Sequence, residues 1–221
     1  MASERNVEKS ATRKTSGGRA GRAHTSGKKS GPRGVELLSS KLSYSGPLFQ
    51  VFTDRIRENG RELRRDVIRH GGSAVILALD DSESKTDPLV ILERQYRHAT
   101  DGYLLEVPAG KLEPGENQLS GAKRELLEET GYRARHWSRL VRYFASPGFL
   151  GEWMQVFLAE GLESGDAAPE YDEQIEIQKI PLSEVLRMIE DGKIHDGKTL
   201  IAILLYSRLH QSKGGSRRNK K

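Results

Sequence analysis

Short runs of apolar residues, several of them alternating with polar ones, recur between residues 48 and 180. Runs of this length, bounded by polar or turn-forming residues, are typical of β-strands. Asp-Asp-Ser at 80–82 and Thr-Asp-Gly at 100–102 supply turn residues between neighbouring runs. The pattern predicts strands at Leu48–Thr53, Val67–His70, Ser73–Leu79, Leu89–Gln95, Tyr103–Val107, Ser138–Phe144, Gln155–Ala159 and Ile175–Ile180.

Three other segments carry apolar residues at helical spacing. We expect a helix from about Asn117 to Thr130, followed by Gly131 at the position where glycine commonly ends a helix. A second helix is expected to begin near Ser183 and to stop at Gly192. A third is expected over residues 198–210, with the aliphatic residues Leu200, Ile201, Leu204, Leu205 and Leu209.

The order of these elements indicates the fold class. The predicted strands outnumber the helices and do not alternate with them regularly, which does not fit a repeated strand–helix–strand fold. No internal repeat is visible. The chain of 221 residues is long enough for one well-packed domain with extensions. We therefore expect an α+β sandwich with mixed β-sheets, in a single domain over residues 35–212.

Charge is distributed unevenly along the chain, whose formal net charge is +5. Residues 1–34 hold nine Lys or Arg and two Glu, and residues 213–221 hold five Lys or Arg and no acid. Removing these residues from the totals leaves 22 basic and 29 acidic residues between 35 and 212. The central domain is therefore acidic, and the two ends carry the basic charge.

Both ends are rich in Gly, Ser, Lys and Arg, so we expect disordered basic tails at 1–34 and 213–221. Such tails can keep the protein soluble, or make weak electrostatic contact with nucleic acid or another polyanion. An organelle transit peptide is a third interpretation of the N-terminal tail. We favour the first, because no aromatic residue is interleaved with the charges to stack on a base.

The composition excludes several classes of protein. The chain contains no cysteine, which excludes disulfide scaffolds, thiolate zinc sites and thiol nucleophiles. No apolar run approaches 18 residues, so we expect no transmembrane helix and no membrane partner. The first thirty residues lack the apolar core of a secretory signal. We expect a cytoplasmic protein.

The expected helix at 117–130 carries three carboxylates on one flank. Glu125, Glu128 and Glu129 lie next to its apolar face, where like charges repel each other. Carboxylates grouped in this way suit Mg²⁺ or Mn²⁺, which bind hard oxygen ligands together with substrate phosphate. In the preceding loop, Gly110 allows the backbone to come close to a metal or a phosphate. The segment therefore predicts a metal and phosphate site.

The spacing of this segment matches a known signature. Gly110 is followed after five residues by Glu116, and after seven more by the run RELLEETGY at 124–132. This resembles the Nudix hydrolase signature, G-x5-E-x7-R-E-U-x-E-E-x-G-U, in which U is a bulky aliphatic residue. Each defined position matches except the last, where Tyr132 stands in place of the aliphatic residue. Eight fixed residues at fixed spacing, in a loop that leads into a helix, make this match specific.

Further segments resemble the ADP-ribose pyrophosphatase branch of this family. They are the segments Glu93–Arg97, Leu105–Lys111, Ser146–Glu152, with Pro147 fifteen residues past the signature, and the acidic loop Asp172–Glu176. The resemblance covers residues 44–210 and leaves both tails outside. It implies a Nudix-type α/β/α sandwich that hydrolyses the diphosphate of ADP-ribose or a related ADP-sugar to AMP and a sugar phosphate.

The resemblance also implies the metal ligands. Glu125, Glu129, the backbone carbonyl of Ala109 and the later loop acid Glu173 would hold Mg²⁺, with Mn²⁺ as an alternative. Glu128 would be a further ligand or proton acceptor beside them. A metal in this position would neutralise the diphosphate and position the attacking water.

The resemblance assigns the catalytic base to the acidic loop. Glu173 aligns best with the loop acid used by this branch. Glu170 and Asp172 lie close enough in the sequence to compete for this role.

Substrate contacts are implied for Arg65, Arg97 and Glu152. The arginine fork suits a diphosphate because it donates two hydrogen bonds in one plane, and Glu152 would contact the ribose side. The branch forms homodimers with exchanged N-terminal strands, so strands within 35–70 are expected in the dimer contact and Arg65 can serve the neighbouring site. Candidates for stacking on the adenine are Tyr44, Phe49 and Phe52.

Other functions remain open at this stage. The same signature reads only the diphosphate and the metal, so the substrate could be a GDP-sugar, NADH or FAD. A different class is a module that senses ADP-ribose while the tails contact nucleic acid, but the three intact acids argue against a purely sensory domain. Processing of capped RNA is a further alternative, against which the acidic central domain argues.

Overall fold

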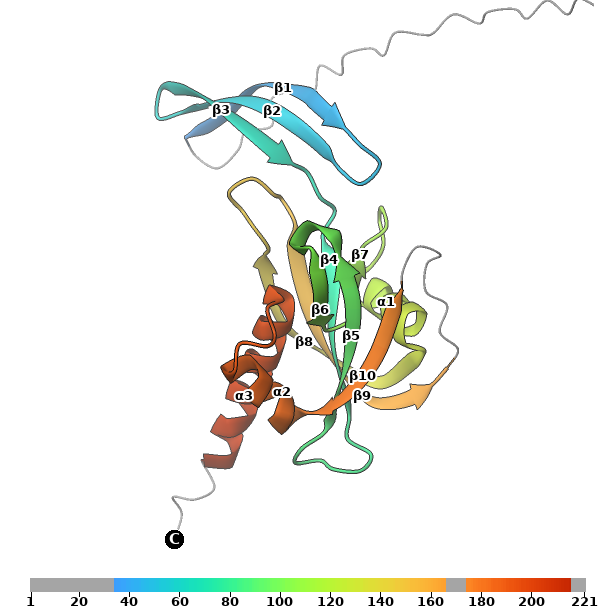
Figure 1. The fold of residues 1–221 in the computed structure, drawn as a ribbon. Helices are drawn as coiled ribbons and strands as arrows, with labels where there is room; N and C mark the ends of the chain where they lie inside the picture. Colours follow the sequence, from blue (N-terminus) through green and yellow to red (C-terminus); the bar gives the residue numbers. More distant parts are fainter. Residues whose placement is uncertain (1–33, 166–173, 216–221) are drawn as a thin grey trace, which may run out of the picture.

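The computed structural model describes residues 34–165 and 174–215, with side chains up to residue 210 (Figure 1). The strands form two separate sheets, and the helices lie against the larger one. Most of the expected basic tails and the acidic loop at 166–173 lie outside the described residues. Within the described part of the chain, no helix is long and apolar enough to cross a membrane.

The larger sheet has seven strands and is mixed. Its main path runs β10 (Ile175–Pro181), β5 (Leu89–Arg97), β4 (Ser73–Asp80), β9 (Trp153–Ser164) and β8 (Tyr132–Phe144). The short strands β6 (Gly102–Glu106) and β7 (Ala109–Lys111) pair with β5 and β4, respectively. Strands β4 and β9 run parallel, whereas β4 pairs with β5 and β7 in antiparallel register. The expected mixed sheet is confirmed.

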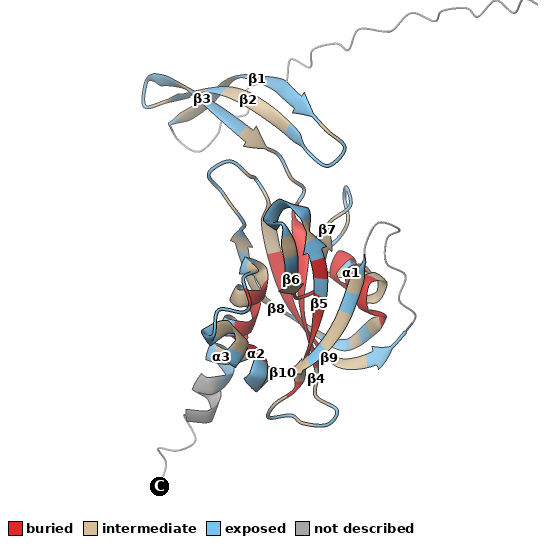
Figure 2. Ribbon diagram, in the orientation of Figure 1, coloured by how far each residue is buried: buried red, intermediate tan, exposed pale blue. Residues whose placement is uncertain are grey.

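Helices cover both faces of this sheet. Helix α1 (Gln118–Thr130) lies on one face, and α2 (Leu182–Glu190) and α3 (Gly197–Gly215) lie on the other (Figure 1). Seven successive residues of β4 are buried. Because successive strand residues point to opposite faces, the strand is covered on both sides. Buried residues gather in the central strands and the helix faces that meet them (Figure 2). The expected α/β/α sandwich is therefore confirmed.

The two cores show the alternation directly. One core joins Ala74, Ile76 and Ala78 of β4 to Ala122 and Leu126 of α1. The other core joins the intervening β4 residues to the C-terminal helices, and its buried members include Val75, Leu77, Leu79, Val185, Ala202 and Ile203.

Local signals set the helix ends. The Asn117 side chain accepts a hydrogen bond from Leu119 N at 2.9 Å and caps α1, and Gly131 ends it with a φ of 72°. Helix α2 ends just before Gly192, as expected. Helix α3 does not end at 210 but continues to Gly215, past the predicted start of the C-terminal tail at 213.

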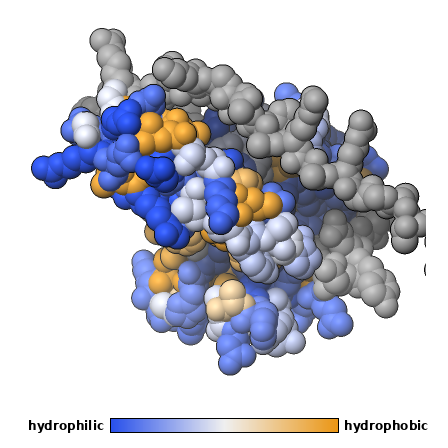
Figure 3. All heavy atoms as spheres, turned by 90° about the horizontal axis from the view of Figure 1, so that it is seen from above, coloured by the Kyte–Doolittle hydropathy of each residue, from blue (hydrophilic) through white to orange (hydrophobic). Residues whose placement is uncertain are grey.

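The smaller sheet consists of β1 (Val35–Ser45), β2 (Gln50–Glu58) and β3 (Arg61–Ile68), paired antiparallel. No residue of these three strands, all of which the structure describes, is buried (Figure 2). Seen from above, apolar side chains lie among strongly hydrophilic ones at this end of the molecule (Figure 3). The sheet is tied to the sandwich through Ile68, whose N–H donates to the carbonyl of Phe149 at 2.8 Å.

Several strands differ from the sequence-based expectation. Strand β1 was not predicted, and β3 covers Arg61–Ile68 where Val67–His70 was expected. Most residues of β3 are charged, and neither face is buried, so no alternation of apolar residues marks it. Strand β7 was also missed, since its three residues, Ala-Gly-Lys, carry no strand pattern.

Candidate active site

The segment between β6 and α1 passes close to α1. Strand β7 pairs with β4, with Gly110 opposite Ala74. At Gly110 the backbone approaches α1 so closely that an added Cβ would overlap the carboxylate of Glu125. A side chain at this position would require the Glu125 carboxylate to move, so Gly110 leaves room for this carboxylate beside the backbone.

Two of the predicted metal ligands are buried in the same region. Glu125 and Glu129 lie one turn apart on α1 and are 9% and 7% exposed, respectively. The N–H of Ala109 donates to Oε2 of Glu129 at 3.1 Å. The structure therefore brings together Ala109, Gly110, Glu125 and Glu129.

Arg124 lies among the acidic side chains of the signature. Its guanidinium pairs with Glu116 at 3.1 Å, with Glu125 at 2.9 Å and with Glu128 at 2.8 Å. It also donates to the carbonyl of Lys111 at 3.1 Å. Its hydrogen bond to Glu116, followed by the other carboxylates, raises the pKa of Arg124, and the same bond lowers the pKa of Glu116. One cation thus offsets the mutual repulsion of these acids.

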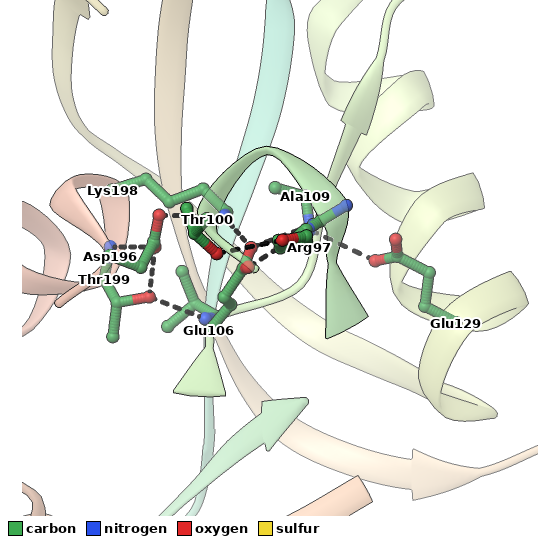
Figure 4. A network of polar contacts seen from close by, with 9 residues as sticks. Arg97, Thr100, Glu106, Ala109, Glu129, Asp196, Lys198 and Thr199 are labelled. Carbon is green, nitrogen blue, oxygen red and sulfur yellow. Dashed lines mark hydrogen bonds and ion pairs between the residues drawn. The ribbon is translucent and has the colours of Figure 1, made fainter. Parts of the chain in front are cut away.

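The predicted substrate arginine, Arg97, lies at the end of β5 and forms a two-point ion pair with Glu106. Its Nε and Nη2 donate to the two carboxylate oxygens at 2.8 and 2.9 Å (Figure 4). The Glu106 side chain is only 3% exposed, whereas that of Arg97 is 39% exposed. Arg97 is therefore anchored to a buried carboxylate while part of its side chain stays accessible to solvent.

Two residues at the start of α3 complete this network. Lys198 Nζ contacts both Glu106 and Asp196, the latter at 3.1 Å. Thr199, which is fully buried, donates from Oγ1 to Asp196 at 2.6 Å and accepts from the N–H of Val107 at 2.8 Å (Figure 4). The sequence analysis missed Lys198 and Asp196. The signal was a lysine in the first turn of a helix, where the dipole disfavours a cation unless carboxylates compensate.

Burial by itself would raise the pKa of Glu106. The hydrogen bonds and charges of Arg97 and Lys198 outweigh burial, so the pKa of Glu106 lies below its usual range. The same hydrogen bond, between Arg97 and Glu106, raises the pKa of Arg97. Both groups are charged at neutral pH.

These elements enclose one pocket with a volume of about 540 Å³. Its walls are the backbone and side chains of 109–113, the polar face of α1, Arg97 of β5 and Leu48 from the turn before β2. The α1 residues that line it are Arg124, Glu125, Glu128 and Glu129. The pocket thus combines acids with a partly exposed arginine, a pattern suited to a cation and an anionic ligand together.

Two predicted residues that the structure describes, Arg65 and Glu152, do not line this pocket. Arg65 lies on β3 in the smaller sheet, where its guanidinium donates to the carbonyl of Arg64. Glu152 accepts a hydrogen bond from Ser73 Oγ at 2.7 Å and lies 3.7 Å from His70 Nδ1. Glu173 lies outside the described residues, as do its competitors Glu170 and Asp172.

The predicted adenine-stacking residues lie on the smaller sheet and its first turn. The rings of Tyr44 and Phe49 are 5.7 Å apart, and both side chains are exposed. The ring of Phe52 lies 4.1 Å from the guanidinium carbon of Arg69. None of the three lines the pocket in a single copy of the chain, although Leu48 from the same turn does.

The donor set of the pocket fits a hard divalent cation. It offers carboxylates of α1 and backbone carbonyls of a loop held against them, without a nitrogen or sulfur ligand. Within the described residues, no three acidic or histidine side chains are grouped closely enough to hold a metal by themselves.

Replacement of Glu106 by Gln should change how stability depends on pH. The lowered pKa means that the charge of Glu106 stabilises the fold above the usual carboxyl range, and that this contribution is lost as pH falls through the lowered value. Denaturant unfolding at pH 7 should show a loss of about 1.5–3 kcal/mol in Glu106→Gln. The difference from wild type should stay level above the usual carboxyl range and shrink as the pH falls below it.

The matched control is Glu176→Gln, because Glu176 forms an exposed pair with Arg94 at 3.4 Å. Its loss should stay below about 0.5 kcal/mol at every pH. A Glu106→Gln difference that does not change with pH would contradict a charged Glu106.

Comparison with known proteins places this geometry in a family. A family model of the NUDIX domain matches residues 69–202. An ADP-ribose pyrophosphatase of Bacillus subtilis is 35% identical over 171 residues, which cover 76% of this chain and 90% of that protein. A GDP-mannose pyrophosphatase of Salmonella arizonae is 38% identical over 191 residues, covering 80% and 96%.

A methanol dehydrogenase activator of Bacillus methanolicus is also similar, at 34% identity over 171 residues, 76% of this chain and 90% of that protein. Among solved structures, that of an ADP compounds hydrolase superposes with a TM-score of 0.72, covering 84% of this chain and 98% of the other at 22% identity. That similarity concerns the fold. Because the family model matches more than half of the chain and the relatives match nearly their full lengths, this chain belongs to the Nudix family.

Proposed function

We propose that this chain hydrolyses the diphosphate bond of ADP-ribose, or of a related ADP-sugar, to AMP and a sugar phosphate. The observation that carries the proposal is the pocket in which the acids of α1 face Arg97 across the loop at 109–113. The similarity to an ADP-ribose pyrophosphatase over most of both chains supports this substrate class.

The reaction adds water across the diphosphate. A bond forms between the water oxygen and one phosphorus, the bond from that phosphorus to the bridging oxygen breaks, and the water loses a proton to a base. Arg97 would donate hydrogen bonds to the diphosphate through Nη1, which lies outside its pair with Glu106. Glu128 is accessible, with 39% of its side chain exposed, and would accept a proton or bind a cation.

Nudix enzymes generally use a divalent metal ion, and we propose Mg²⁺, with Mn²⁺ as an alternative, for this chain. Glu125, Glu129, the carbonyl of Ala109 and Glu173 would hold it. Bound there, the ion would neutralise the diphosphate and lower the pKa of a bound water. Glu173 remains our proposed base, with Glu152 on the ribose side.

A GDP-sugar is the second candidate substrate. The GDP-mannose pyrophosphatase relative is 38% identical to this chain, slightly more than the ADP-ribose pyrophosphatase relative. Both substrates present the same diphosphate to the α1 acids, so the base and sugar subsites decide between them.

Hydrolysis assays on purified protein test the proposal. Wild type with Mg²⁺ should release AMP from ADP-ribose, and EDTA should abolish the release. Glu129→Gln should lower kcat by about a hundredfold or more, because it removes a charged oxygen from the cation site. Glu184→Gln is the matched control, an exposed acid on α2 outside the pocket, and should keep wild-type activity.

GDP-mannose, NADH, FAD and capped RNA complete the panel. Preference for GDP-mannose would make a GDP-sugar the proposed substrate and leave the proposed diphosphate hydrolysis unchanged. Absence of metal-dependent hydrolysis of every compound would contradict the proposed function.

We propose that the smaller sheet is covered by a second copy of the chain. Leu42, Tyr44 and Leu37 are about half exposed, and none of the strands β1–β3 contains a buried side chain. An isolated three-stranded sheet without a buried face has little to stabilise it. In such a homodimer Arg65, which lies opposite Asp54 in the register of β2 and β3, could reach the site of the other copy.

Light scattering on the protein as it elutes from a size-exclusion column tests this arrangement. Wild type should have about twice the chain mass of 24.7 kDa. Leu42→Asp should shift the protein towards the monomer, because it places a charge in the apolar contact. Leu204→Asp on α3, at similar exposure, should remain a dimer. A monomeric wild type would contradict the proposal.

The cytoplasmic location and the weak contact of the basic tails with polyanions stay predictions. Both rest on the composition of the sequence.

A further inference from the structure

The start of α3 makes contacts that the proposed chemistry does not by itself require. Lys198 projects from the first turn of this helix towards Glu106, the partner of Arg97 (Figure 4). Arg97 and Glu106 belong to the neighbouring strands β5 and β6, whereas Lys198 belongs to α3 and lies 92 residues after Glu106. A link therefore runs from the pocket arginine to the C-terminal helix.

The network is enclosed and balanced in charge. The side chains of Glu106, Lys198 and Asp196 are 3%, 10% and 15% exposed, respectively. Two carboxylates meet two cations, Arg97 and Lys198, so no charge of the four is left without an opposite partner. Removing either cation would leave the buried Glu106 carboxylate with only part of its compensation.

The geometry of the pair fixes the direction of Arg97. Its Nε and Nη2 are both held by Glu106, which sets the plane of the guanidinium. Glu106 can hold that plane only if its own carboxylate is fixed, and Lys198 contacts its Oε2 from the other side. Lys198 also shares the negative charge of Glu106, so less of the positive charge of Arg97 is neutralised within the protein.

The same turn of α3 holds the backbone that leads to the cation site. Thr199 Oγ1 accepts from the N–H of Val107, two residues before Ala109. Asp196 in turn accepts from both Thr199 and Lys198. Residues 196–199 therefore contact both the support of Arg97 and the support of the loop.

We infer that Lys198 is a positioning residue for substrate binding, which orients Arg97 towards the diphosphate through Glu106 and keeps part of its charge available to the ligand. This inference rests on the proposed function, because it needs a diphosphate substrate for Arg97. Lys198 itself does not line the pocket. Its contact with Glu106 connects it to Arg97, which does line the pocket.

Steady-state kinetics of single and double variants test this dependence. Lys198→Met should raise KM by about tenfold with kcat changed by less than about threefold, because Arg97 binds the substrate before and during the reaction. Arg97→Lys keeps a cation beside Glu106 but loses the planar fork, and should raise KM by a similar factor. In the Arg97→Lys background, Lys198→Met should raise KM by less than about twofold further.

Two further variants separate positioning from stability. Lys198→Arg preserves the cation and should restore KM to within about threefold of wild type. Lys193→Met is the matched control, since Lys193 pairs with Asp191 at 2.9 Å on an exposed surface, and should leave KM unchanged. Thermal unfolding of each variant shows whether it is folded under the assay conditions. If Lys198→Met does not fold, Glu106→Gln takes its place in the comparison with Arg97→Lys, alone and combined. A neutral amide at 106 cannot compensate both cations.

The outcomes are distinguishable. A wild type that hydrolyses ADP-ribose or GDP-mannose, with a Lys198 effect that disappears in the Arg97→Lys background, supports the inference. Full additivity of the two substitutions, or a loss confined to kcat, would overturn the inference and leave the proposed function intact. A wild type that hydrolyses neither compound would overturn both.

Discussion

The architecture depends on how the backbone between Glu106 and Lys111 is held between two helices. The N–H of Ala109 is bonded to Glu129 of α1, and the N–H of Val107 is bonded to Thr199 of α3. The carbonyl of Pro108 accepts from Ile76 in the central strand at 2.8 Å. The peptide groups 106–107 and 108–109 are thus fixed to both sides of the sandwich and to its centre. A shift of either helix would be transmitted directly to the loop.

This constraint explains why buried charges are tolerated at the site. Glu125, Glu129 and Glu106 are each less than 10% exposed, and burying a carboxylate is costly unless it is paired. Arg124 compensates the acids of the signature, while Arg97 and Lys198 compensate Glu106. The two clusters lie on opposite sides of the same loop. The substrate of a Nudix enzyme brings further negative charge to the site. The arginines and Lys198 therefore offset part of the carboxylate charge, and a bound cation would offset the rest.

The sequence predicted most of the sandwich and the α1 part of the site. Asn117 and Gly131 mark the ends of α1, and the uninterrupted apolar run of β4 reflects burial on both faces. The fixed spacing of the signature identified Gly110, Glu125 and Glu129, because their backbone requirements and charges are local properties. These residues need only one loop and one helix to meet.

The remaining features depend on contacts between distant segments. Arg97 and Glu106 are not opposite each other in the β5–β6 register, where Glu106 faces Glu93, and Lys198 joins their pair only because α3 packs across the sheet. No local pattern links residues 106 and 198, although a lysine in the first turn of a helix indicates an unusual environment. Most of strand β3 was not predicted for a different reason: its charged residues show no regular alternation, because neither face of the strand is buried within one chain.

The central claim is that the diphosphate binds between Arg97 and the acids of α1. The most direct measurement is a crystal structure with Mg²⁺ and an ADP-ribose analogue in which a methylene group replaces the bridging oxygen. We predict the two phosphates in the 540 Å³ pocket, with Arg97 Nη1 on a phosphate oxygen and a cation between the phosphates and Glu125 and Glu129. An analogue bound with full occupancy elsewhere, and with these side chains untouched, would contradict the account.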